Sequence, residues 1–394
     1  CFERVAMLAA ARPGWRSPAL ACAQRWCGAG VRPDGIPPMV WAKVGVDNHR
    51  NPQHPVGILK AKTEQYFRDT FKDAAGKPLF VAFDQFHPVV TTKANFDDLL
   101  IPKDHISRSK SDTFYVDAEH VLRTQSTAHQ SKILADGHNA VVWTADVYRK
   151  DEIDRYHYPV FHQTDAVRLW PKSELPQDPA EMTVFVVNDL KATLEGLARH
   201  LFGPREIRWD EAATFPFTDP SIELEVDFDD RWVECLGCGM IRPEILEDCG
   251  RGDMAGWAFG IGLERLAMIF CQIPDIRIFW SQDRRFLDQY ADGELNVFKP
   301  FSKYPPVYKD VSFWTPSADF TANDFFVVVR EHVQEIVECV EVVDEFTHPK
   351  TGKHSLCCRV TYRSLERNLT HDEVNSIHNK LLEAVVDELQ VELR

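Results

Sequence analysis

Three glycines lie within seven residues in the stretch Gly256-Trp-Ala-Phe-Gly-Ile-Gly-Leu-Glu-Arg265, which leads into an apolar segment with helical spacing. Glycine allows the backbone to approach a ligand closely, and the free N–H groups at the start of a helix favour anions. Arg265, one turn into the expected helix, adds a positive charge. The stretch lacks the Gly-Lys-Ser/Thr of a phosphate-binding loop. These residues alone therefore indicate either an anion site or a glycine turn before a buried helix.

A second polar group accompanies two expected strands, at 141–149 and 160–170, which a polar decapeptide separates. Both strands alternate in character and are rich in β-branched and aromatic residues, which favours an antiparallel pair. Gln163 and Asp165 share one face because side chains alternate along a strand. Arginine can bind phosphate through two hydrogen bonds, and a carboxylate can pair with an ammonium group. Arg149 lies at the mouth of the loop. The two strands and their loop therefore form either a site that binds a phosphate and an amine, or a solvated hairpin.

Aromatic and acidic residues between these two segments could complete a binding site. Phe215 and Phe217 flank Pro216, which restricts this segment to an edge strand or an irregular one. The two rings either form a wall for an aromatic substrate or pack in the core. Glu234 stands among apolar neighbours on an expected strand. It either contacts an ammonium group or a metal-bound nucleotide, or it is a surface residue.

The elements that position these residues predict an α+β domain over about 50–290, with a mainly antiparallel sheet flanked by helices. The clearest strand is 221–228, where apolar residues alternate strictly with acids. A turn is expected at Gly237-Cys-Gly239, before the glycine stretch. The expected helices lie at 58–71, 122–135 and 182–202, and the expected strands at 79–83, 113–116, 141–149, 160–170, 207–209, 221–228 and 232–240.

Residues 301–394 predict an independent unit with the order β-α-β-β-α-β, which is the ferredoxin-like pattern. Asn323 is expected to cap a helix that extends to 338, and Thr370-His-Asp-Glu373 is a capping box that opens another helix. The expected strands are 310–314, 340–346, 355–362 and 391–393. This fold by itself does not specify a function.

Composition limits the class of protein. The net charge of −15 argues against a general nucleic-acid coating protein, and no apolar run approaches the ~20 residues that a membrane span needs. The ten cysteines include one Cys-x-x-Cys, Cys235 and Cys238, without the further ligands of a zinc site. We interpret these cysteines as reduced thiols in a reducing compartment, and we expect no structural metal.

The N-terminal segment 1–40 differs from the rest. Its first 33 residues hold five arginines, many alanines and a single acid, which is typical of an organellar transit peptide. The alternative is a disordered or mistranslated tail. Because the chain starts with Cys1, we expect the true start to lie upstream. The proposed division is then 1–40, the α+β domain at 41–295 and the ferredoxin-like domain at 301–394.

A family resemblance connects these segments. Val147-Tyr-Arg-Lys150 with Phe161-His-Gln163 resembles motif 2 of the class II aminoacyl-tRNA synthetases, and the glycine stretch through Arg265 resembles their motif 3. Phe215-Pro-Phe217 and the segment Phe301-Ser-Lys-Tyr-Pro-Pro-Val-Tyr-Lys-Asp-Val-Ser-Phe-Trp314 narrow the resemblance to the phenylalanyl-tRNA synthetases. It runs from about residue 50 to the C-terminus, with the motifs in order. The attached C-terminal unit, which binds the anticodon in that family, resembles the single-chain mitochondrial type.

The resemblance implies a phenylalanine–tRNA ligase that uses ATP with Mg²⁺. Its partners would be phenylalanine, ATP and phenylalanine tRNA, without a membrane. It would act as a monomer in the mitochondrial matrix or, alternatively, in a plastid. No room remains in the chain for a separate editing domain, so some charging with tyrosine is expected.

The family roles fall on matching positions. The ATP-binding set would be Arg149, Tyr156, His157, Tyr158, Gly260, Gly262 and Arg265, in which the two arginines would act catalytically by stabilising charge. The amino-acid-binding set would be Thr127, Ala128, His129, Gln130, Gln163, Thr164, Asp165, Phe215, Phe217, Glu234 and Phe259.

Departures from the family pattern leave two alternative interpretations of the function open. This chain has Gln125-Ser126-Thr127 where the family usually has His-Thr-Ser, and Asp165 where it usually has glutamate. We expect a shifted contact with the substrate amine and not an inactive site. The first alternative is a catalytically weakened paralogue that binds RNA without charging it. The second is an α-like subunit that requires a β partner.

Basic residues gather on one hairpin of the otherwise acidic C-terminal unit. They predict a local path for the tRNA backbone, although a solvated hairpin would have the same composition. The residues concerned are Lys350, Lys353, Arg359 and Arg363, followed by Arg367.

Overall fold

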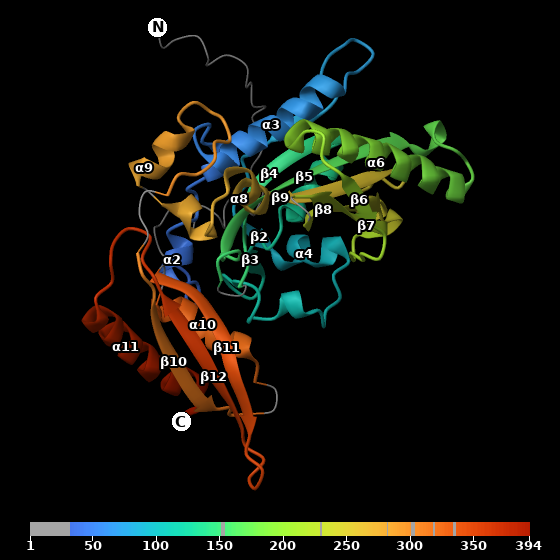
Figure 1. Ribbon diagram of the computed structural model, residues 1–394. Coiled ribbons are helices and arrows are strands. Elements are labelled where there is room, and N and C mark those ends of the chain that lie inside the picture. The colour runs from blue at the N-terminus through green and yellow to red at the C-terminus, as the bar shows by residue number, and fades with distance from the viewer. Residues whose placement is uncertain are drawn as a thin grey trace.

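The computed structural model describes residues 32–150, 154–228, 231–281, 283–300, 304–317, 320–333 and 336–394 (Figure 1). Most of the segment interpreted as transit-peptide-like, residues 1–31, lies outside the described residues. Its last part differs from that interpretation. Ile36, Met39 and Val40, in and beside the short helix α2 (Pro38–Trp41), are buried in the core of the larger unit. Apolar side chains thus tie this part of the segment to the fold.

A seven-stranded sheet forms the centre of the larger unit, in the order β1-β4-β5-β9-β8-β7-β6. β1 is parallel to β4, and the other neighbouring strands are antiparallel. This architecture confirms the predicted α+β class. The strands are β1 (Val81–Phe83), β4 (Ala140–Tyr148), β5 (Val160–Pro171), β6 (Ile207–Asp210), β7 (Thr218–Asp227), β8 (Trp232–Ile241) and β9 (Met254–Gly262).

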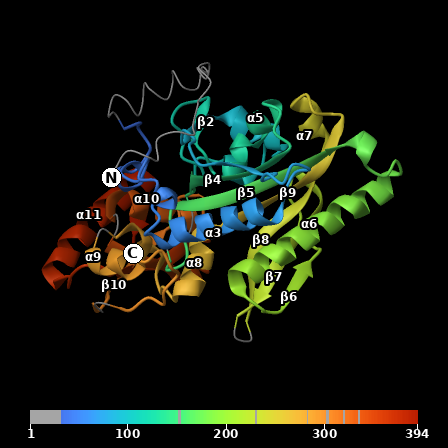
Figure 2. The same ribbon diagram turned by 90° about the horizontal axis from the view of Figure 1, so that it is seen from above.

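Helices cover both faces of this sheet (Figure 2). One face packs against α3 (Pro55–Thr70), α6 (Pro179–Phe202) and α8 (Leu263–Cys271), and the other against α5 (Gln130–Ala135) and α7 (Pro243–Asp248). All nine residues of β4 are buried because both of its faces are covered. Two short strands, β2 (Val89–Thr91) and β3 (His120–Leu122), and α4 (Thr92–Asn95) lie on the α5 side.

The glycine-rich segments are strands, where turns were expected. Gly237 and Gly239 lie within β8, and a Cβ on Gly237 would stand 2.6 Å from the ring of Phe215. In β9, a Cβ on Gly256 would stand 1.9 Å from the carbonyl oxygen of Arg168. These glycines therefore serve close packing between neighbours, and α8 begins only at Leu263.

Two further predictions of secondary structure were wrong in part. The helix expected at 122–135 is divided into the end of β3, a 3-10 helix η4 (Ser126–His129) and α5. The break arises because the amide of Thr124 donates to Asn95 Oδ1 at 2.9 Å, which holds the backbone extended. The strand expected at 113–116 is reduced to a single bridge between Tyr115 and Val121.

The smaller unit has the predicted βαββαβ order, and its sheet runs β11-β12-β10-β13. The capping box at Thr370 and Glu373 is confirmed. The first helix ends earlier than predicted, and Asn323 lies within it. The elements are β10 (Val307–Trp314), α10 (Ala322–Val333), β11 (Val337–Thr347), β12 (His354–Tyr362), α11 (His371–Leu389) and β13 (Glu392–Leu393).

Polar contacts join the two units beside the loop that follows β4. The buried carboxylate of Glu338 in β11 accepts a hydrogen bond from Arg155 at 2.6 Å and forms an ion pair with Arg363 at 2.9 Å. Asn323 Nδ2 donates to the carbonyl oxygen of Ser111 at 3.1 Å. The C-terminal unit therefore lies directly against the larger unit, close to the predicted site.

Within the described part of the chain, no helix combines the length and apolar character needed to cross a bilayer. Cys235 and Cys238 are buried free thiols in β8. Their reduced state agrees with the prediction, although their segment is a strand.

Candidate active site

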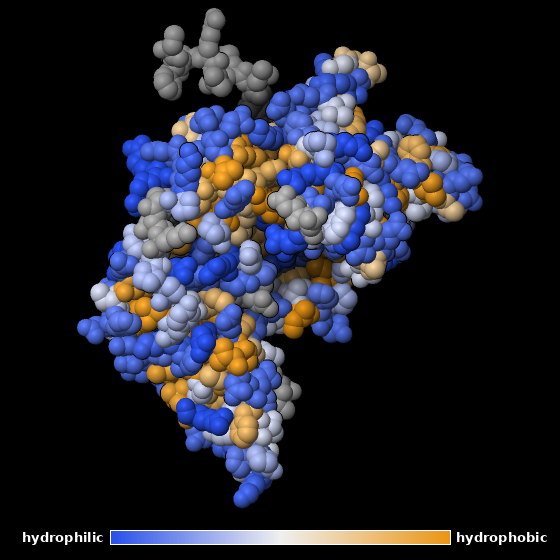
Figure 3. Space-filling model, viewed as in Figure 1, coloured by the Kyte–Doolittle hydropathy of each residue, from blue (hydrophilic) through white to orange (hydrophobic). Residues whose placement is uncertain are grey.

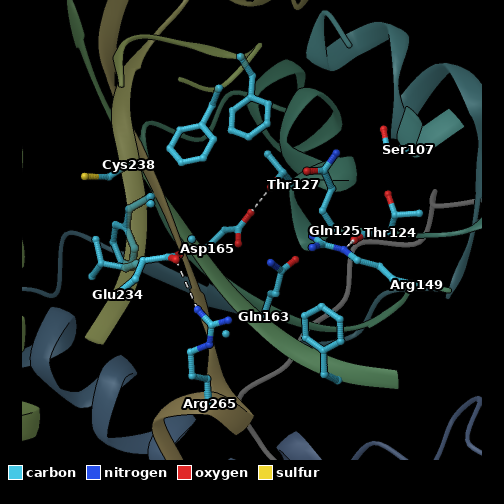
Figure 4. A pocket seen from close by; sticks show the side chains of 18 of the residues that line it. Ser107, Thr124, Gln125, Thr127, Arg149, Gln163, Asp165, Glu234, Cys238 and Arg265 are labelled. Atoms are coloured by element: carbon cyan, nitrogen blue, oxygen red, sulfur yellow. Dashed lines mark hydrogen bonds and ion pairs between the residues drawn. The ribbon is translucent and has the colours of Figure 1, made fainter. Parts of the chain in front are cut away.

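A cavity of about 690 Å³ lies on the sheet face that carries η4 and α5 (Figure 4). The hairpin strands, the Phe-Pro-Phe loop and the glycine stretch, which are distant in sequence, all contribute to its wall. The predicted site residues that line it are Thr127, Gln130, Arg149, Tyr156, His157, Tyr158, Gln163, Asp165, Phe215, Phe217, Glu234, Phe259, Gly260, Gly262 and Arg265.

A buried carboxylate stands at the centre of the cavity. Asp165 is 3% exposed, and it accepts hydrogen bonds from Ser126 Oγ and Thr127 Oγ1, each at 2.6 Å. Burial raises the pKa of Asp165 to about 6, although these two hydrogen bonds and the charge of Arg149 act in the opposite direction. Gln163 points into the same cavity from two residues earlier on β5 (Figure 4). This arrangement suits a substrate ammonium group.

Arg149 lies at one side of this carboxylate, just after the end of β4 (Figure 4). Its Nε donates to the carbonyl oxygen of Thr124 at 2.6 Å, and its guanidinium lies 5.3 Å from the ring centroid of Phe161. His157, in the loop beyond, has Nδ1 2.8 Å from Asp154 Oδ2. The loop and the strand end thus give the cavity a cationic side suited to a phosphate.

Arg265 stands at the other side, in the first turn of α8. It is about half exposed, and its Nη1 lies 3.5 Å from Glu234 Oε2 of β8. The preceding residue, Glu264, is fixed: it accepts the backbone N–H of His162 at 2.7 Å and lies 2.5 Å from the ring nitrogen Nδ1. Burial alone would lower the pKa of His162, but Glu264 outweighs it and the net shift is upward. The start of α8 is therefore anchored to β5.

The aromatic wall comes from the loop before β7. The rings of Phe215 and Phe217 are nearly parallel, at 8°, with centroids 5.7 Å apart. The amide of Phe215 donates to Ser221 Oγ at 3.1 Å, and Gly237 leaves space for the ring. The two rings and their small neighbours enclose a slot suited to a planar aromatic side chain.

Several lining residues were not among the predicted site residues. Thr218 and Ala258 line the cavity, and the fully buried Ser126 lies beside it and donates to Asp165, whereas the side chain of Cys238 packs in the core on the other face of the sheet. Alternation along β9 could have indicated Ala258, which shares a face with Gly260. Phe259, by contrast, stacks its ring on Phe67 of α3 on the other face, with centroids 5.8 Å apart.

Three predicted residues do not line the cavity. Thr164 faces away from it and bonds to Thr144, with the two hydroxyl oxygens 2.7 Å apart. Ala128 packs in the small core beneath β2 and β3. His129 has Nε2 2.8 Å from Arg123 Nη1, and burial holds its pKa well below the usual range. None of these three side chains faces the cavity.

Comparison with known families agrees with the fold and the cavity. Residues 52–290 match the family described as "tRNA synthetases class II core domain (F)", and residues 302–394 match the "Ferredoxin-fold anticodon binding domain". The chain therefore belongs to the class II tRNA synthetases.

Curated relatives narrow this class. The chain is 47% identical over 362 residues to "Phenylalanine--tRNA ligase, chloroplastic/mitochondrial" of Arabidopsis thaliana, covering 92% of this chain and 83% of the relative. The Mus musculus "Phenylalanine--tRNA ligase, mitochondrial" is 44% identical, covering 90% and 84%. The Drosophila melanogaster "Probable phenylalanine--tRNA ligase, mitochondrial" is 42% identical, covering 91% and 89%. Within its class, this chain belongs to the phenylalanine–tRNA ligase family.

Proposed function

We propose that this protein activates phenylalanine with ATP and transfers it to phenylalanine tRNA. One observation carries the proposal beyond family membership: a single cavity combines a buried carboxylate, a parallel pair of phenylalanine rings and an arginine on each side. Phenylalanine has an ammonium group and a ring that fit the first two features. ATP, bound as its Mg²⁺ complex, has phosphates that fit the third.

The reaction proceeds in two steps. A carboxylate oxygen of phenylalanine bonds to the α-phosphorus of ATP, the bond from that phosphorus to its bridging oxygen breaks, and pyrophosphate leaves. The oxygen of a terminal tRNA hydroxyl then bonds to the acyl carbon and its proton passes to solvent, while the bond from the acyl carbon to the phosphate oxygen breaks and AMP leaves. Asp165 and Gln163 hold the ammonium group, and Arg149 and Arg265 stabilise the phosphate charge. The protein contributes positioning and electrostatics, and it forms no covalent bond of its own.

The remaining nucleotide contacts are assigned to the loop 156–158 and to β9. Gly262 has no atom within 4 Å of the position where a Cβ would stand, and a Cβ on Gly260 would stand 3.0 Å from Asp165 Oδ1. The backbone of β9 is therefore open to a ligand at Gly262, whereas Gly260 lies against Asp165. Tyr158 is buried and stacks on Trp280, with centroids 6.0 Å apart, which steadies the loop.

We assign tRNA binding to the C-terminal unit, whose β11–β12 hairpin extends away from the catalytic unit (Figure 1). Of the four basic residues proposed there, Arg359 is paired with Asp310, Lys353 with Glu392 and Arg363 with the buried Glu338. The contact of Arg363 with Glu338 lies at the junction between the two units, so Lys350 and Lys353 are the better candidates for the phosphate path.

An aromatic cluster beside this hairpin offers a second mode of RNA binding. The ring centroids of Trp314, Phe346 and His348 lie 6.3–6.4 Å apart, and Arg394 lies 5.2 Å from Trp314 and 4.8 Å from Phe346. On the face of the C-terminal unit shown in Figure 3, apolar and hydrophilic side chains are interspersed. Aromatic rings beside cations are the usual platform for unpaired bases.

We place the protein in the mitochondrial matrix, following the names of its relatives, and we propose that it acts as a monomer. A plastid location remains the alternative, because the Arabidopsis relative is named for both organelles. The size of the purified chain in solution tests the monomer against an α-like subunit with a partner.

Phenylalanine-dependent exchange of pyrophosphate into ATP by the purified full chain tests the function. We expect exchange with phenylalanine and none with leucine or alanine. Absence of exchange, with tRNA binding retained, would favour the weakened paralogue.

A further inference from the structure

The carboxylate of Asp165 is held at both oxygens. Ser126 Oγ donates to Oδ1 and Thr127 Oγ1 donates to Oδ2, each at 2.6 Å. Ser126 is fully buried, and Asp165 nearly so. A carboxylate with one donor on each oxygen cannot rotate without breaking a hydrogen bond, so its direction in the cavity is fixed.

Ser126 is itself fixed by its backbone. Its N–H donates to Gln163 Oε1 at 3.1 Å, and its carbonyl oxygen accepts the indole N–H of Trp143 at 3.0 Å. Ser126 therefore joins the amide of Gln163 and the carboxylate of Asp165, the two groups proposed to bind the substrate ammonium. It contacts both of them and does not itself need to contact the substrate.

The two residues that hold Asp165 are adjacent in the chain. Ser126 and Thr127 both donate to Asp165, whereas the preceding Gln125 donates to the carbonyl oxygen of Asn95 at 3.3 Å. An aspartate is one methylene shorter than a glutamate, so its carboxylate lies closer to the backbone of β5. The adjacent hydroxyls on η4 reach it at that position.

Charged and titratable groups around Asp165 come from five elements. Arg149 follows β4, and its charge favours the ionised carboxylate. His129 on η4 is kept neutral by burial, because its pKa is well below the usual range. His162 on β5 is occupied by Glu264 of α8 on the other face, and Glu234 of β8 lies beside Arg265. Ser126 and Thr127 are the two hydroxyl donors to Asp165 within the described chain.

We propose that Ser126 is a positioning residue for the ammonium group of the amino-acid substrate, acting through Asp165. Together with Thr127, it holds the short carboxylate in the direction and in the ionised form that binding requires. This inference rests on the proposed function, because it assumes that the ammonium group binds at Asp165.

Calorimetric binding to the full chain tests the proposal without requiring turnover. The probes are phenylalanine and 3-phenylpropionate, which is phenylalanine without its amine. For Ser126→Ala we expect the Kd for phenylalanine to rise roughly 10- to 100-fold, the range for loss of one charge-assisted hydrogen bond. The Kd for 3-phenylpropionate should change less than about twofold. Equal weakening of both ligands, or of neither, would overturn the proposal.

The pH dependence separates positioning from a general structural defect. Phenylalanine affinity should fall as the pH decreases through the pKa of Asp165, and in Ser126→Ala this decrease should begin at higher pH, because a hydrogen bond that favours the anion is lost. Ser126→Thr, which keeps the hydroxyl, should restore the wild-type profile. Thr144→Val removes a buried hydroxyl that faces away from the cavity and should leave the profile unchanged. An unshifted profile in Ser126→Ala would contradict the assignment.

The two hypotheses fail differently. If the wild-type chain binds phenylalanine no better than 3-phenylpropionate, the proposed ammonium site is absent and both fail. If it prefers phenylalanine and Ser126→Ala keeps that preference, only the role of Ser126 fails.

Discussion

The guanidinium of Arg265 and the carboxylate of Glu234 lie 3.5 Å apart at one side of the cavity, and both side chains are about half exposed. An exposed ion pair contributes only ~0–1 kcal/mol to stability, so this contact does not hold the fold together. The neighbouring residue Glu264 is buried against His162 and anchors α8. The helix is thus fixed, and the phosphate contact proposed for Arg265 would replace only its exposed pair with Glu234.

Replacement of Arg265 by alanine should damage activation directly. We expect Arg265→Ala to lower kcat for pyrophosphate exchange by roughly 10²- to 10³-fold, because a charge that stabilises the transition state is lost. Arg199→Ala is the matched control, since Arg199 forms a similar exposed pair with Glu195 at 3.4 Å on α6. Full exchange activity in Arg265→Ala would remove Arg265 from the catalytic set.

Asp165 should reduce the stability of the free protein at neutral and alkaline pH. Its folded-state pKa of about 6 lies above the ordinary 3.8, so its favourable contribution is complete below about pH 4 and is lost as the pH rises through 6. Asp165→Asn carries no charge at this position. At pH 8 its free energy of unfolding should therefore exceed that of the wild type by up to ~3 kcal/mol, and it should unfold at a higher temperature.

Thermal unfolding at pH 8 and pH 5 checks this expectation. The difference between Asp165→Asn and the wild type should shrink at pH 5, and phenylalanine should stabilise only the wild type. A variant that is less stable than the wild type at pH 8 would contradict the assignment.

Discrimination against tyrosine should be modest. The slot proposed to receive the substrate ring is lined by Phe215 and Phe217, with the small residues Thr218 and Ala258 nearby. A largely apolar pocket rejects an added hydroxyl by only ~10². Charging of tRNA with phenylalanine and with tyrosine, compared as kcat/KM, measures this ratio. A ratio above roughly 10⁵ would show that the slot excludes the hydroxyl by other means.

Charge reversal on the C-terminal hairpin should weaken tRNA binding. We expect Lys350→Glu to raise the Kd for phenylalanine tRNA several-fold and to reduce the salt dependence by the equivalent of about one phosphate contact. Arg359→Glu should have a smaller effect because Arg359 is already paired with Asp310 at 2.7 Å. Lys191→Glu, on α6 of the catalytic unit, serves as the control. Equal binding by all three variants and the wild type would rule out the path.

Loss of the aromatic cluster should weaken tRNA binding without changing its salt dependence. Trp314→Ala removes a ring that can stack on a base, an interaction worth about 1–3 kcal/mol. Pyrophosphate exchange, which needs no tRNA, should be unaffected and reports whether the fold is intact. A Kd that remains at the wild-type value would exclude Trp314 as a base platform.

Much of the architecture follows from local patterns. Strict alternation along β7, and the β-branched residues of the hairpin strands, predicted β-strands with buried faces. The capping box at Thr370 predicted the start of α11. The order of these elements was sufficient for both folds. The predictions that failed were those where a long-range contact decides the local conformation, as at Thr124 and at the glycines of β8 and β9.

The sequence by itself determined which residue types the site contains: two arginines, a carboxylate with an amide on one strand face, and a pair of rings. Only the tertiary structure decided how they meet, because the pairing of β5 with β9 brings Asp165 opposite Gly260. The break in the expected helix at Thr124 likewise places Ser126 on that carboxylate. Such contacts join residues about 40 to 100 positions apart, and no local pattern encodes them.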